Sequence, residues 1–302
     1  MKNRLADELM SSSDIKGVLG TKVIEGSGEG QNVGILLSTH GNERAPFTVL
    51  PIVLDLIRNQ LRGNLMLVMV NPEAYKINQR FVEFDMNRVY KKNGPDGNTL
   101  EDIRARELLP VFSELYVALD LHTVPINPGA RAFTVIPGKT DLQKKLAQQL
   151  DVQYNVLYPS YINDTGSTSD AFVAEGKACM TLELGEEGKV DISAQVFNIL
   201  RYLMYTESIS EITLPKKVEK NTWLEVSQME FVGDPQTIAY DEGFIRKSFE
   251  PVYKDQVIAR DTKGIYQADE EGILLFSRPF DRYKDGSDAL TEPFVYLAKE
   301  VQ

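Results

Sequence analysis

Short apolar runs alternate with segments of helical periodicity over the first two thirds of the chain. The apolar runs lie near residues 21–24, 32–38, 64–70, 116–121, 131–136 and 178–184. Several are apolar throughout, which is typical of strands covered on both faces of a sheet. Helical patterns lie near residues 45–58, 99–115, 140–150, 168–176 and 189–205. This alternation predicts an α/β fold with a mainly parallel sheet covered on both faces.

The pattern changes after about residue 207. The following stretch is polar and β-branched, with turn residues at 233–235 and further short apolar runs at 252–259 and 272–276. These features are typical of short strands joined by turns. The sequence therefore predicts a larger α/β domain over residues 1–207 and a small β-rich domain over residues 208–302.

Charge and composition limit the kinds of partner. The 302 residues carry a formal net charge of −11, which argues against a nucleic-acid backbone as ligand, because phosphate binding depends on clustered Lys and Arg. An anionic ligand must instead be held by a local group of cations. No apolar stretch approaches the roughly 20 residues that cross a bilayer, and the first residues contain no apolar core of signal-peptide length. Together with a single cysteine, Cys179, this predicts a cytoplasmic protein without membrane association.

The only two histidines both follow predicted strands. His40 lies just after the run at 32–38, with Glu43 three residues later, and His122 ends the run that begins at 116. Carboxyl ends of strands are where α/β sheets present their ligand sites. Asp120 shares the strand face of His122 and is placed to orient its ring as a hydrogen-bond acceptor.

Two imidazoles and one carboxylate form a three-ligand set that leaves a fourth position for water. Structural zinc sites use four protein ligands, usually including cysteines, whereas catalytic sites keep one position open. The single cysteine excludes a cysteine-rich structural site, so the ligand count favours catalysis. The alternative is that both histidines are merely solvated or hydrogen-bonded loop residues.

Glu183 is the one charged group that projects from the run at 178–184, because Leu182 and Leu184 face the opposite side of a strand. Beside a metal, a carboxylate can take a proton from water and pass it to a leaving amine. The alternative is a strand-end glutamate that contacts solvent.

Two guanidinium groups and an amide lie close together at 79–88, namely Arg80, Arg88 and Asn87. Guanidinium groups bind carboxylates in a bidentate manner and can stabilise an oxyanion. Salt bridges to Glu83 or Asp85 in a solvated loop are the alternative.

Four motifs together resemble the succinylglutamate desuccinylase/aspartoacylase family of zinc-dependent N-acyl amino acid hydrolases, which are related to zinc carboxypeptidases. They are STHGNE at 38–43, FDMNR at 84–88, LDLH at 119–122 and TLELG at 181–185. The desuccinylase branch is the most similar, chiefly through ACMTLELG and the chain length. The resemblance implies an α/β/α sandwich with a mixed sheet, followed by a β-rich domain that narrows access to the active site.

The same resemblance implies a role for each residue of the motifs. His40, Glu43 and His122 would bind one zinc ion per chain, and Glu183 would be the general base and proton shuttle. Arg80 would polarise the scissile carbonyl and stabilise the oxyanion. Asn87 and Arg88 would bind a substrate carboxylate.

One position departs from the family pattern. Family members carry an arginine ten residues before the catalytic glutamate, where this chain has Val173. Lys177 and Arg131 are candidates to replace that cation in substrate binding. Tyr283 matches a family tyrosine that closes over the substrate.

The predicted reaction is hydrolysis of an N-acyl amino acid, with N-succinylglutamate giving succinate and glutamate as the leading example. A zinc carboxypeptidase acting on short peptides uses the same residues and is one alternative. A non-catalytic protein that binds a metabolite through its metal is another. The sequence predicts a small-molecule partner and leaves the oligomeric state open, a homo-oligomer included.

Overall fold

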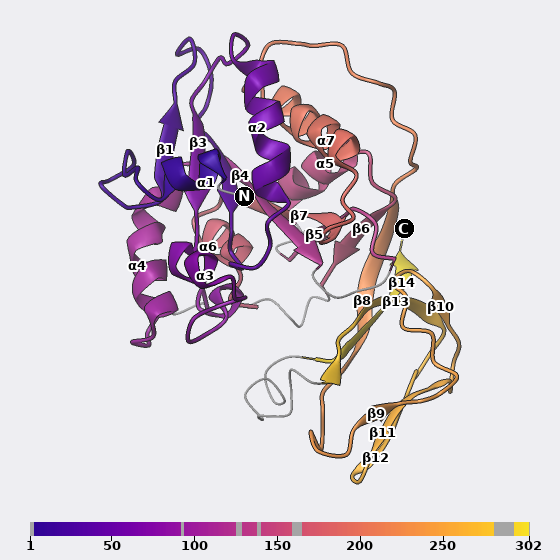
Figure 1. The fold of residues 1–302 in the computed structure, drawn as a ribbon. Helices are drawn as coiled ribbons and strands as arrows, with labels where there is room; N and C mark the ends of the chain where they lie inside the picture. Colours follow the sequence, from indigo (N-terminus) through magenta and orange to yellow (C-terminus); the bar gives the residue numbers. More distant parts are fainter. Residues whose placement is uncertain are drawn as a thin grey trace.

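Eleven strands form one continuous mixed sheet through the whole computed structural model (Figure 1). The structure describes residues 3–91, 94–124, 129–137, 140–158, 165–280 and 293–301. The strand order is β1-β3-β2-β4-β7-β5-β6-β8-β14-β13-β10, and a separate small sheet has the order β12-β11-β9.

Up to residue 207, the described part of the chain contains seven strands and seven α-helices. The strands are β1 (Thr21–Ile24), β2 (Val33–Leu37), β3 (Leu65–Met69), β4 (Val117–Val124), β5 (Phe133–Ile136), β6 (Tyr154–Leu157) and β7 (Ala178–Glu186). The helices are α1 (Arg4–Leu9), α2 (Pro46–Ile57), α3 (Pro72–Ile77), α4 (Leu100–Phe112), α5 (Asp141–Gln149), α6 (Thr168–Ala174) and α7 (Ile192–Tyr205), with a 3-10 turn η1 (Met86–Arg88). The predicted strands and helices of this part are all present.

Strand pairing is parallel at the centre of this sheet, where β3, β2, β4 and β7 run side by side. β1 pairs antiparallel with β3, and β5 pairs antiparallel with β7. The predicted mixed, mainly parallel sheet is therefore confirmed. No described helix is long and apolar enough to cross a membrane.

Strands β2 and β3 are buried on both faces, as their unbroken apolar sequences predict. In β2, Ile35 and Leu37 pack into the core below α1, α2, α5 and α7, whereas Leu36 packs into the core of α4 and α6. Side chains on a strand alternate between faces, so each strand serves both cores. The result is the predicted α/β/α sandwich.

The α4 side of the sheet therefore receives the even-numbered side chains of β4, including Asp120 and His122. Helix α4 begins at a capping box, in which Thr99 and Asp102 each accept from the other's backbone N–H. Such reciprocal bonds satisfy donors that the first helical turn would leave unpaired.

Residues beyond 207 form the strands β8 (Thr222–Glu230), β9 (Ala239–Tyr240), β10 (Pro251–Val252), β11 (Val257–Asp261), β12 (Gly264–Gln267), β13 (Gly272–Ser277) and β14 (Val295–Val301). This is the predicted β-rich region. The run at 252–259 is not one strand, because β10 ends at Val252 and β11 begins at Val257 in a different sheet. β8 pairs in parallel with β6, so the main sheet continues into this region.

Candidate metal centre and active site

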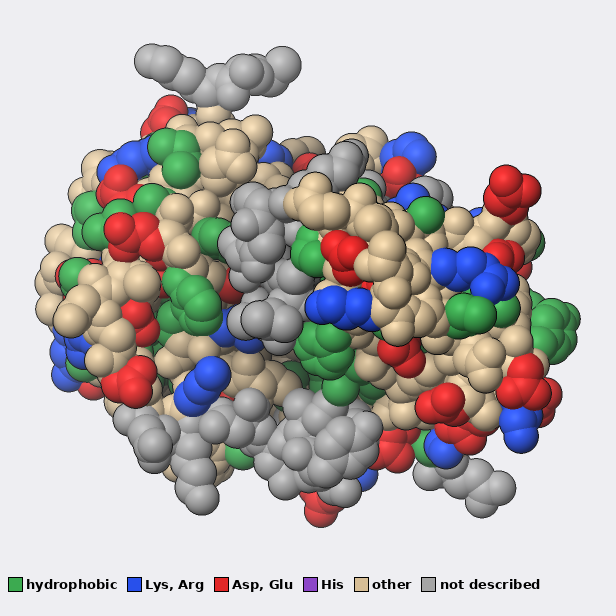
Figure 2. Space-filling view, turned by 90° about the horizontal axis from the view of Figure 1, so that it is seen from below, with side chains coloured by type: hydrophobic (Ala, Val, Ile, Leu, Met, Phe, Trp, Pro, Cys, Tyr) green, Lys and Arg blue, Asp and Glu red, His purple; other side chains and the backbone are tan. Residues whose placement is uncertain are grey.

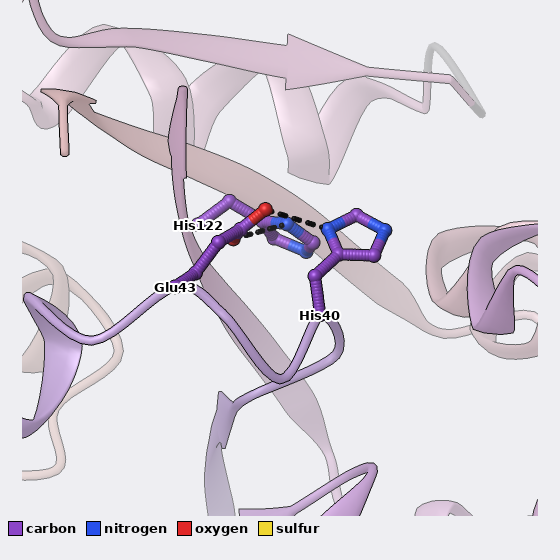
Figure 3. Close-up of side chains that lie close together, drawn as sticks. All are labelled: His40, Glu43 and His122. Carbon is purple, nitrogen blue, oxygen red and sulfur yellow. Dashed lines mark hydrogen bonds and ion pairs between the residues drawn. The ribbon is translucent and has the colours of Figure 1, made fainter. Parts of the chain in front are cut away.

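The structure brings His122 together with His40 and Glu43, although His122 lies far from the other two along the chain (Figure 3). His40 and Glu43 lie in the loop between β2 and α2, and His122 lies near the carboxyl end of the adjacent parallel strand β4. One ligand atom from each residue lies within 4.8 Å of the other two. All three side chains are buried, and no histidine is visible on the face shown in Figure 2. Three donors at this spacing fit a single metal ion.

The loop that carries His40 and Glu43 requires close backbone packing. A Cβ atom added to Gly41 would meet the backbone carbonyl carbon of Ala74 in α3 at 2.1 Å, so only glycine fits there. The Gly41 N–H donates to the carbonyl oxygen of Arg80 at 3.1 Å. The ligand loop is thereby joined to the segment that carries Arg80.

Each imidazole has one nitrogen toward Glu43 and the other toward a second carboxylate. The Nδ1 atoms of His40 and His122 lie 2.7 Å and 3.1 Å from the two Glu43 oxygens. The Nε2 atom of His40 lies 3.3 Å from Asp85 Oδ1, and that of His122 lies 3.1 Å from Asp120 Oδ2. A carboxylate that holds the proton on Nε2 leaves the Nδ1 lone pair directed at a metal.

Asp120 is itself held in place from two sides. It is wholly buried and accepts hydrogen bonds from the Thr39 hydroxyl at 2.9 Å and the Thr168 hydroxyl at 2.6 Å. These bonds fix the carboxylate below His122. The sequence-based expectation that Asp120 lies beside the His122 ring agrees with this geometry.

The buried imidazole rings and carboxylates of this cluster stabilise each other's charged forms. Burial alone would raise the pKa of Glu43, but the nearby His40 and His122 rings outweigh it and lower that pKa. Burial likewise opposes the charged form of His122, but Asp120 and Glu43 hold its pKa well above the usual value. The cluster therefore favours a positive charge between its carboxylates, which a divalent cation also supplies.

Glu183 lies beside His122 on the neighbouring parallel strand. The two residues are direct partners in the register of β4 and β7, and side chains at such positions share a face of the sheet. Loss of solvent around the carboxyl group raises the pKa of Glu183 to about 7, with Glu43 adding to the effect and His122 opposing it. Among the described residues, Glu183 Oε2 has no hydrogen-bond partner. A carboxylate in this state is suited to exchanging a proton with a bound molecule.

Arg80 lies between Asp85 and the group of His40, Glu43 and His122. This group is called the metal-binding cluster below, because its three donors could hold one ion. Its Nε and Nη2 atoms are 3.0 Å and 2.8 Å from Asp85 Oδ2, and its Nη1 atom is 3.9 Å from Glu43 Oε1. The salt bridge to Asp85 was the alternative role for this arginine, and it is present. The same contact orients the guanidinium group toward the cluster.

Glu101 fixes the backbone next to Arg80. This side chain of α4 is 1% exposed and accepts hydrogen bonds from the backbone N–H groups of Val82, Glu83 and Phe84, and from the Asn71 amide. A buried carboxylate that accepts several N–H groups holds a loop rigidly. The segment 80–88 thus has a defined position relative to the sheet.

A cavity of about 660 Å³ adjoins His40, Glu43 and His122. Its lining includes His40, Glu43, His122, Glu183, Arg80, Asn87 and Arg88. Residues from the β-rich region also line it, namely Met229, Phe231, Phe276, Ser277, Arg278, Pro279, Pro293 and Tyr296. The volume is that of a typical small-molecule site.

Asn87 and Arg88 both line this cavity, as predicted for residues that bind substrate. Asn87 Oδ1 accepts from the backbone N–H of Thr168 at 3.2 Å, and Arg88 Nη1 donates to the Asn87 carbonyl at 2.7 Å. The first contact places the Asn87 side chain at the amino end of α6.

Lys177 does not reach the cavity, which corrects its predicted role in substrate binding. Its Nζ atom donates to the carbonyl oxygens of Phe112 and Ser113 and pairs with Glu175 at 3.0 Å. Lys177 precedes the amino end of β7, whereas Glu183 lies six residues further on, a distance of about 20 Å along a strand.

Arg131 was the other candidate to replace the family arginine, and it is not among the residues that line the cavity. Arg131 donates to Gln153 at an exposed position, at 3.1 Å. Tyr283 lies outside the described residues.

Sequence reasoning missed three residues of the site. Asp85 contacts both His40 and Arg80, and its position within the FDMNR motif was the available signal. Tyr158 and Arg278, which directly follow β6 and β13, also line the cavity. Their sequence surroundings carry no signal, because only the pairing of distant strands brings them to the metal-binding cluster.

Fold and site together define an α/β protein with an open three-ligand site at the carboxyl ends of parallel strands. Residues 29–206 match the family model of the succinylglutamate desuccinylase/aspartoacylase catalytic domain. The match covers more than half of the chain, and the chain belongs to this family.

Individual relatives agree with this assignment. A succinylglutamate desuccinylase of Pseudomonas aeruginosa is 32% identical over 174 residues, which cover 51% of this chain and 51% of that protein. A probable aspartoacylase of Prochlorococcus marinus is 26% identical over 156 residues, covering 48% of this chain and 50% of that protein. The chain thus spans about half the length of the curated relatives it matches.

The fold has a close counterpart among solved structures. The succinylglutamate desuccinylase of Chromobacterium violaceum matches with a TM-score of 0.72 at 18% identity, and the match covers 100% of this chain and 98% of that chain. At this identity the comparison shows the fold alone.

Proposed function

We propose that this protein is a zinc-dependent hydrolase that cleaves the amide bond of an N-acyl amino acid, with N-succinylglutamate as the first substrate to test. The observation that carries the proposal is the convergence of His40, Glu43 and His122 in one cavity with Glu183 and Arg80. Family membership supports the reaction type, and the motif resemblance supports the desuccinylase branch.

His40, Glu43 and His122 would hold the ion, because two imidazoles and a carboxylate with a free fourth position are a ligand set of catalytic zinc sites. When bound, zinc would polarise the amide carbonyl and acidify a water molecule. The Nδ1 atoms of both histidines already face Glu43, and Asp85 and Asp120 hold the opposite ring edges.

The remaining steps fall to side chains of the chain itself. Glu183 takes the proton of the attacking water and later delivers it to the departing amine, for which a carboxyl pKa near neutrality is suited. The Arg80 guanidinium donates to the oxygen that gains negative charge. Asn87 and Arg88 bind a substrate carboxylate. The products are a carboxylic acid and a free amino acid.

Access to the cavity favours a small substrate over a peptide. Met229, Phe231, Phe276 and Tyr296 of the β-rich region line the same cavity as His40, Glu43 and His122. A long peptide would have to displace this wall, whereas an N-acyl amino acid fits within about 660 Å³. This feature supports a deacylase over a carboxypeptidase.

The test is a screen of zinc-supplemented protein against N-succinyl, N-acetyl and N-formyl amino acids and short peptides, with release of the amine as the readout. We expect turnover of an N-acyl amino acid and its loss in Glu183→Gln with zinc retained. Glu186→Gln is the matched control, because Glu186 lies on the same strand and pairs with Lys189 away from the cavity. Preferred peptide cleavage would defeat the deacylase proposal, and unchanged turnover in Glu183→Gln would remove the proposed base.

A further inference from the structure

Glu187 lies where three segments of the site meet. It directly follows β7, and its backbone N–H donates to the Val124 carbonyl at the end of β4 at 3.1 Å. Its carboxylate oxygen Oε2 accepts from the Thr123 hydroxyl at 2.6 Å and from the backbone N–H groups of Arg44 and Ala45 at 3.2 Å and 3.4 Å. One carboxylate therefore joins the end of β4 to the loop that precedes α2.

The donors to this carboxylate are adjacent in sequence to two of the proposed metal ligands. Thr123 directly follows His122, and its own backbone N–H donates to Glu43 Oε2 at 3.0 Å. Arg44 directly follows Glu43. Thr123 is buried, so its hydroxyl group depends on protein partners. The separation of Glu43 and His122 is thus controlled in part by Glu187, a carboxylate outside the set of three ligands.

Glu187 also supplies the cap that α2 lacks. Ala45 is the N-cap residue of this helix, and its side chain makes no capping hydrogen bond. The donors at the start of the helix therefore need an acceptor from another segment. A carboxylate at this end is stabilising because it accepts N–H groups and lies at the positive end of the helix dipole. The start of α2, just beyond Glu43, is held by a side chain from the end of β7.

A bulge in β7 sets the position of this carboxylate. His122 on β4 is opposite Glu183 on β7. Two residues further along β4, Val124 is opposite Glu186, so β7 contains one extra residue. Within this stretch Gly185 has a φ of 108°, a conformation that glycine adopts readily. Bulges redirect side chains and are common next to active sites.

The loop with the first two ligands is tied to α3 on its other side. Arg44 Nε donates to Asn78 Oδ1 at 3.0 Å, and the guanidinium carbon of Arg44 lies 3.5 Å from the centroid of the Tyr75 ring. Helix α3 follows β3, so these contacts do not fix the loop relative to β4. The hydrogen bonds of Glu187 make that connection.

We propose that Glu187 is a positioning residue of the metal centre, which holds Glu43 and His122 at the separation that one ion requires. This inference rests on the metal site of the proposed function and adds a residue that acts through the ligands. Loss of the carboxylate would leave the ligand loop tied to α3 but not to the Thr123 hydroxyl. Partners that orient metal ligands typically change the affinity for the ion about tenfold to a hundredfold.

The test measures zinc affinity in three variants, each prepared without metal and titrated with zinc against a chromophoric chelator. We expect Glu187→Ala to weaken zinc binding about tenfold to a hundredfold, because three donors lose their acceptor. Glu187→Gln keeps an oxygen that can accept the same hydrogen bonds and should remain within about fivefold of wild type. Glu186→Ala is the matched control, since it removes the neighbouring carboxylate, which pairs with Lys189 at 2.7 Å, and it should bind zinc as wild type does.

A second readout separates positioning from general destabilisation. The visible absorption of cobalt bound in place of zinc depends on the geometry of its ligands. In cobalt-saturated protein we expect Glu187→Ala to change this absorption, whereas Glu187→Gln and Glu186→Ala should keep the wild-type spectrum. If Glu187→Ala does not fold, Thr123→Val tests the same connection, because it removes the hydroxyl donor and keeps the backbone N–H that contacts Glu43.

The outcomes distinguish this inference from the proposed function. Wild-type zinc affinity in Glu187→Ala or in the substitute Thr123→Val, an equal loss in Glu186→Ala, or a lower unfolding midpoint with an unchanged cobalt spectrum would overturn the role of Glu187. Turnover of an N-acyl amino acid by the wild type would leave the proposed function intact in each of these cases. If the variants behave as expected but no N-acyl amino acid is hydrolysed, the proposed function fails and the role of Glu187 stands. A wild-type protein that binds no zinc would overturn both.

Discussion

Replacement of Glu101 by glutamine tests how the segment 80–88 contributes to turnover. The two carboxylate oxygens share four donors. Oε1 accepts from the Asn71 amide at 3.1 Å and the Val82 N–H at 2.7 Å, and Oε2 accepts from the Glu83 and Phe84 N–H groups at 3.2 Å and 3.1 Å. In Glu101→Gln one of these oxygens becomes an NH₂ group, which cannot accept a hydrogen bond. Whichever oxygen is replaced, two donors lose their acceptor.

The expected cost follows from these two donors. An unpaired donor costs about 1–3 kcal/mol when it is fully buried. The Val82, Glu83 and Phe84 N–H groups are only partly buried, so the substitution should destabilise the native arrangement by about 6 kcal/mol at most. Proteins are typically stable by only about 5–15 kcal/mol, so the segment would move to recover hydrogen bonds. Arg80 would move with it. A displacement of about 1 Å at a reacting group can lower turnover by up to about a hundredfold.

The assay measures kcat, KM, zinc content and the midpoint of thermal unfolding. We expect Glu101→Gln to lower kcat at least about tenfold and to lower the unfolding midpoint, with zinc still bound. Glu107→Gln makes the same change on the same helix at a side chain that is 53% exposed and pairs with Arg104, and it should resemble wild type. A lower midpoint with normal kcat would show that the segment does not position Arg80. Wild-type values for both would refute the account of Glu101.

Four further perturbations probe the candidate metal centre, the proposed oxyanion donor, the orientation of His122 and the core. Removal of metal by a chelator should abolish turnover and lower the unfolding midpoint, and added zinc should restore both; full activity after complete metal removal would contradict the site. Arg80→Ala should lower kcat about a hundredfold or more, as is typical for the loss of an oxyanion donor, and near-normal turnover would exclude that role. Asp120→Asn should weaken zinc binding about tenfold to a hundredfold because the His122 ring loses its charged acceptor; an unchanged dissociation constant would mean that Asp120 does not orient the ring. Leu119→Ala removes a wholly buried side chain of β4 and should lower the free energy of unfolding by about 2–5 kcal/mol, whereas a cost below about 1 kcal/mol in denaturant titration would contradict the packing.

Strands and helices were predictable where the hydrophobic pattern was long and uninterrupted. Every position of β2, β3 and β4 is buried, and a strand buried on both faces can be read from its apolar sequence alone. β6 was missed because Tyr154–Leu157 contributes only four residues, one of them an asparagine. That asparagine is buried and accepts from Thr134, a contact that the local pattern does not reveal.

The convergence of His40 and His122 was predictable because both follow strands, and strand ends in a parallel sheet meet at one edge. The prediction for Lys177 was wrong for the same physical reason. Lys177 precedes the strand that carries Glu183, so it lies at the opposite edge of the sheet. Asp85 and Arg278 depend on contacts between segments far apart in the chain, and no local spacing encodes those.

The pairing of β8 with β6 has a consequence for how the molecule can be divided. If the chain were cut near residue 207, β6 would lose its hydrogen-bonded neighbour β8 along Tyr154–Leu157. The backbone N–H and C=O groups on that side of β6 would then be unpaired. Exposed strand edges of this kind pair with other chains and promote aggregation. The first two thirds of the protein, although they contain every proposed metal ligand, would therefore make a poor fragment for expression on their own.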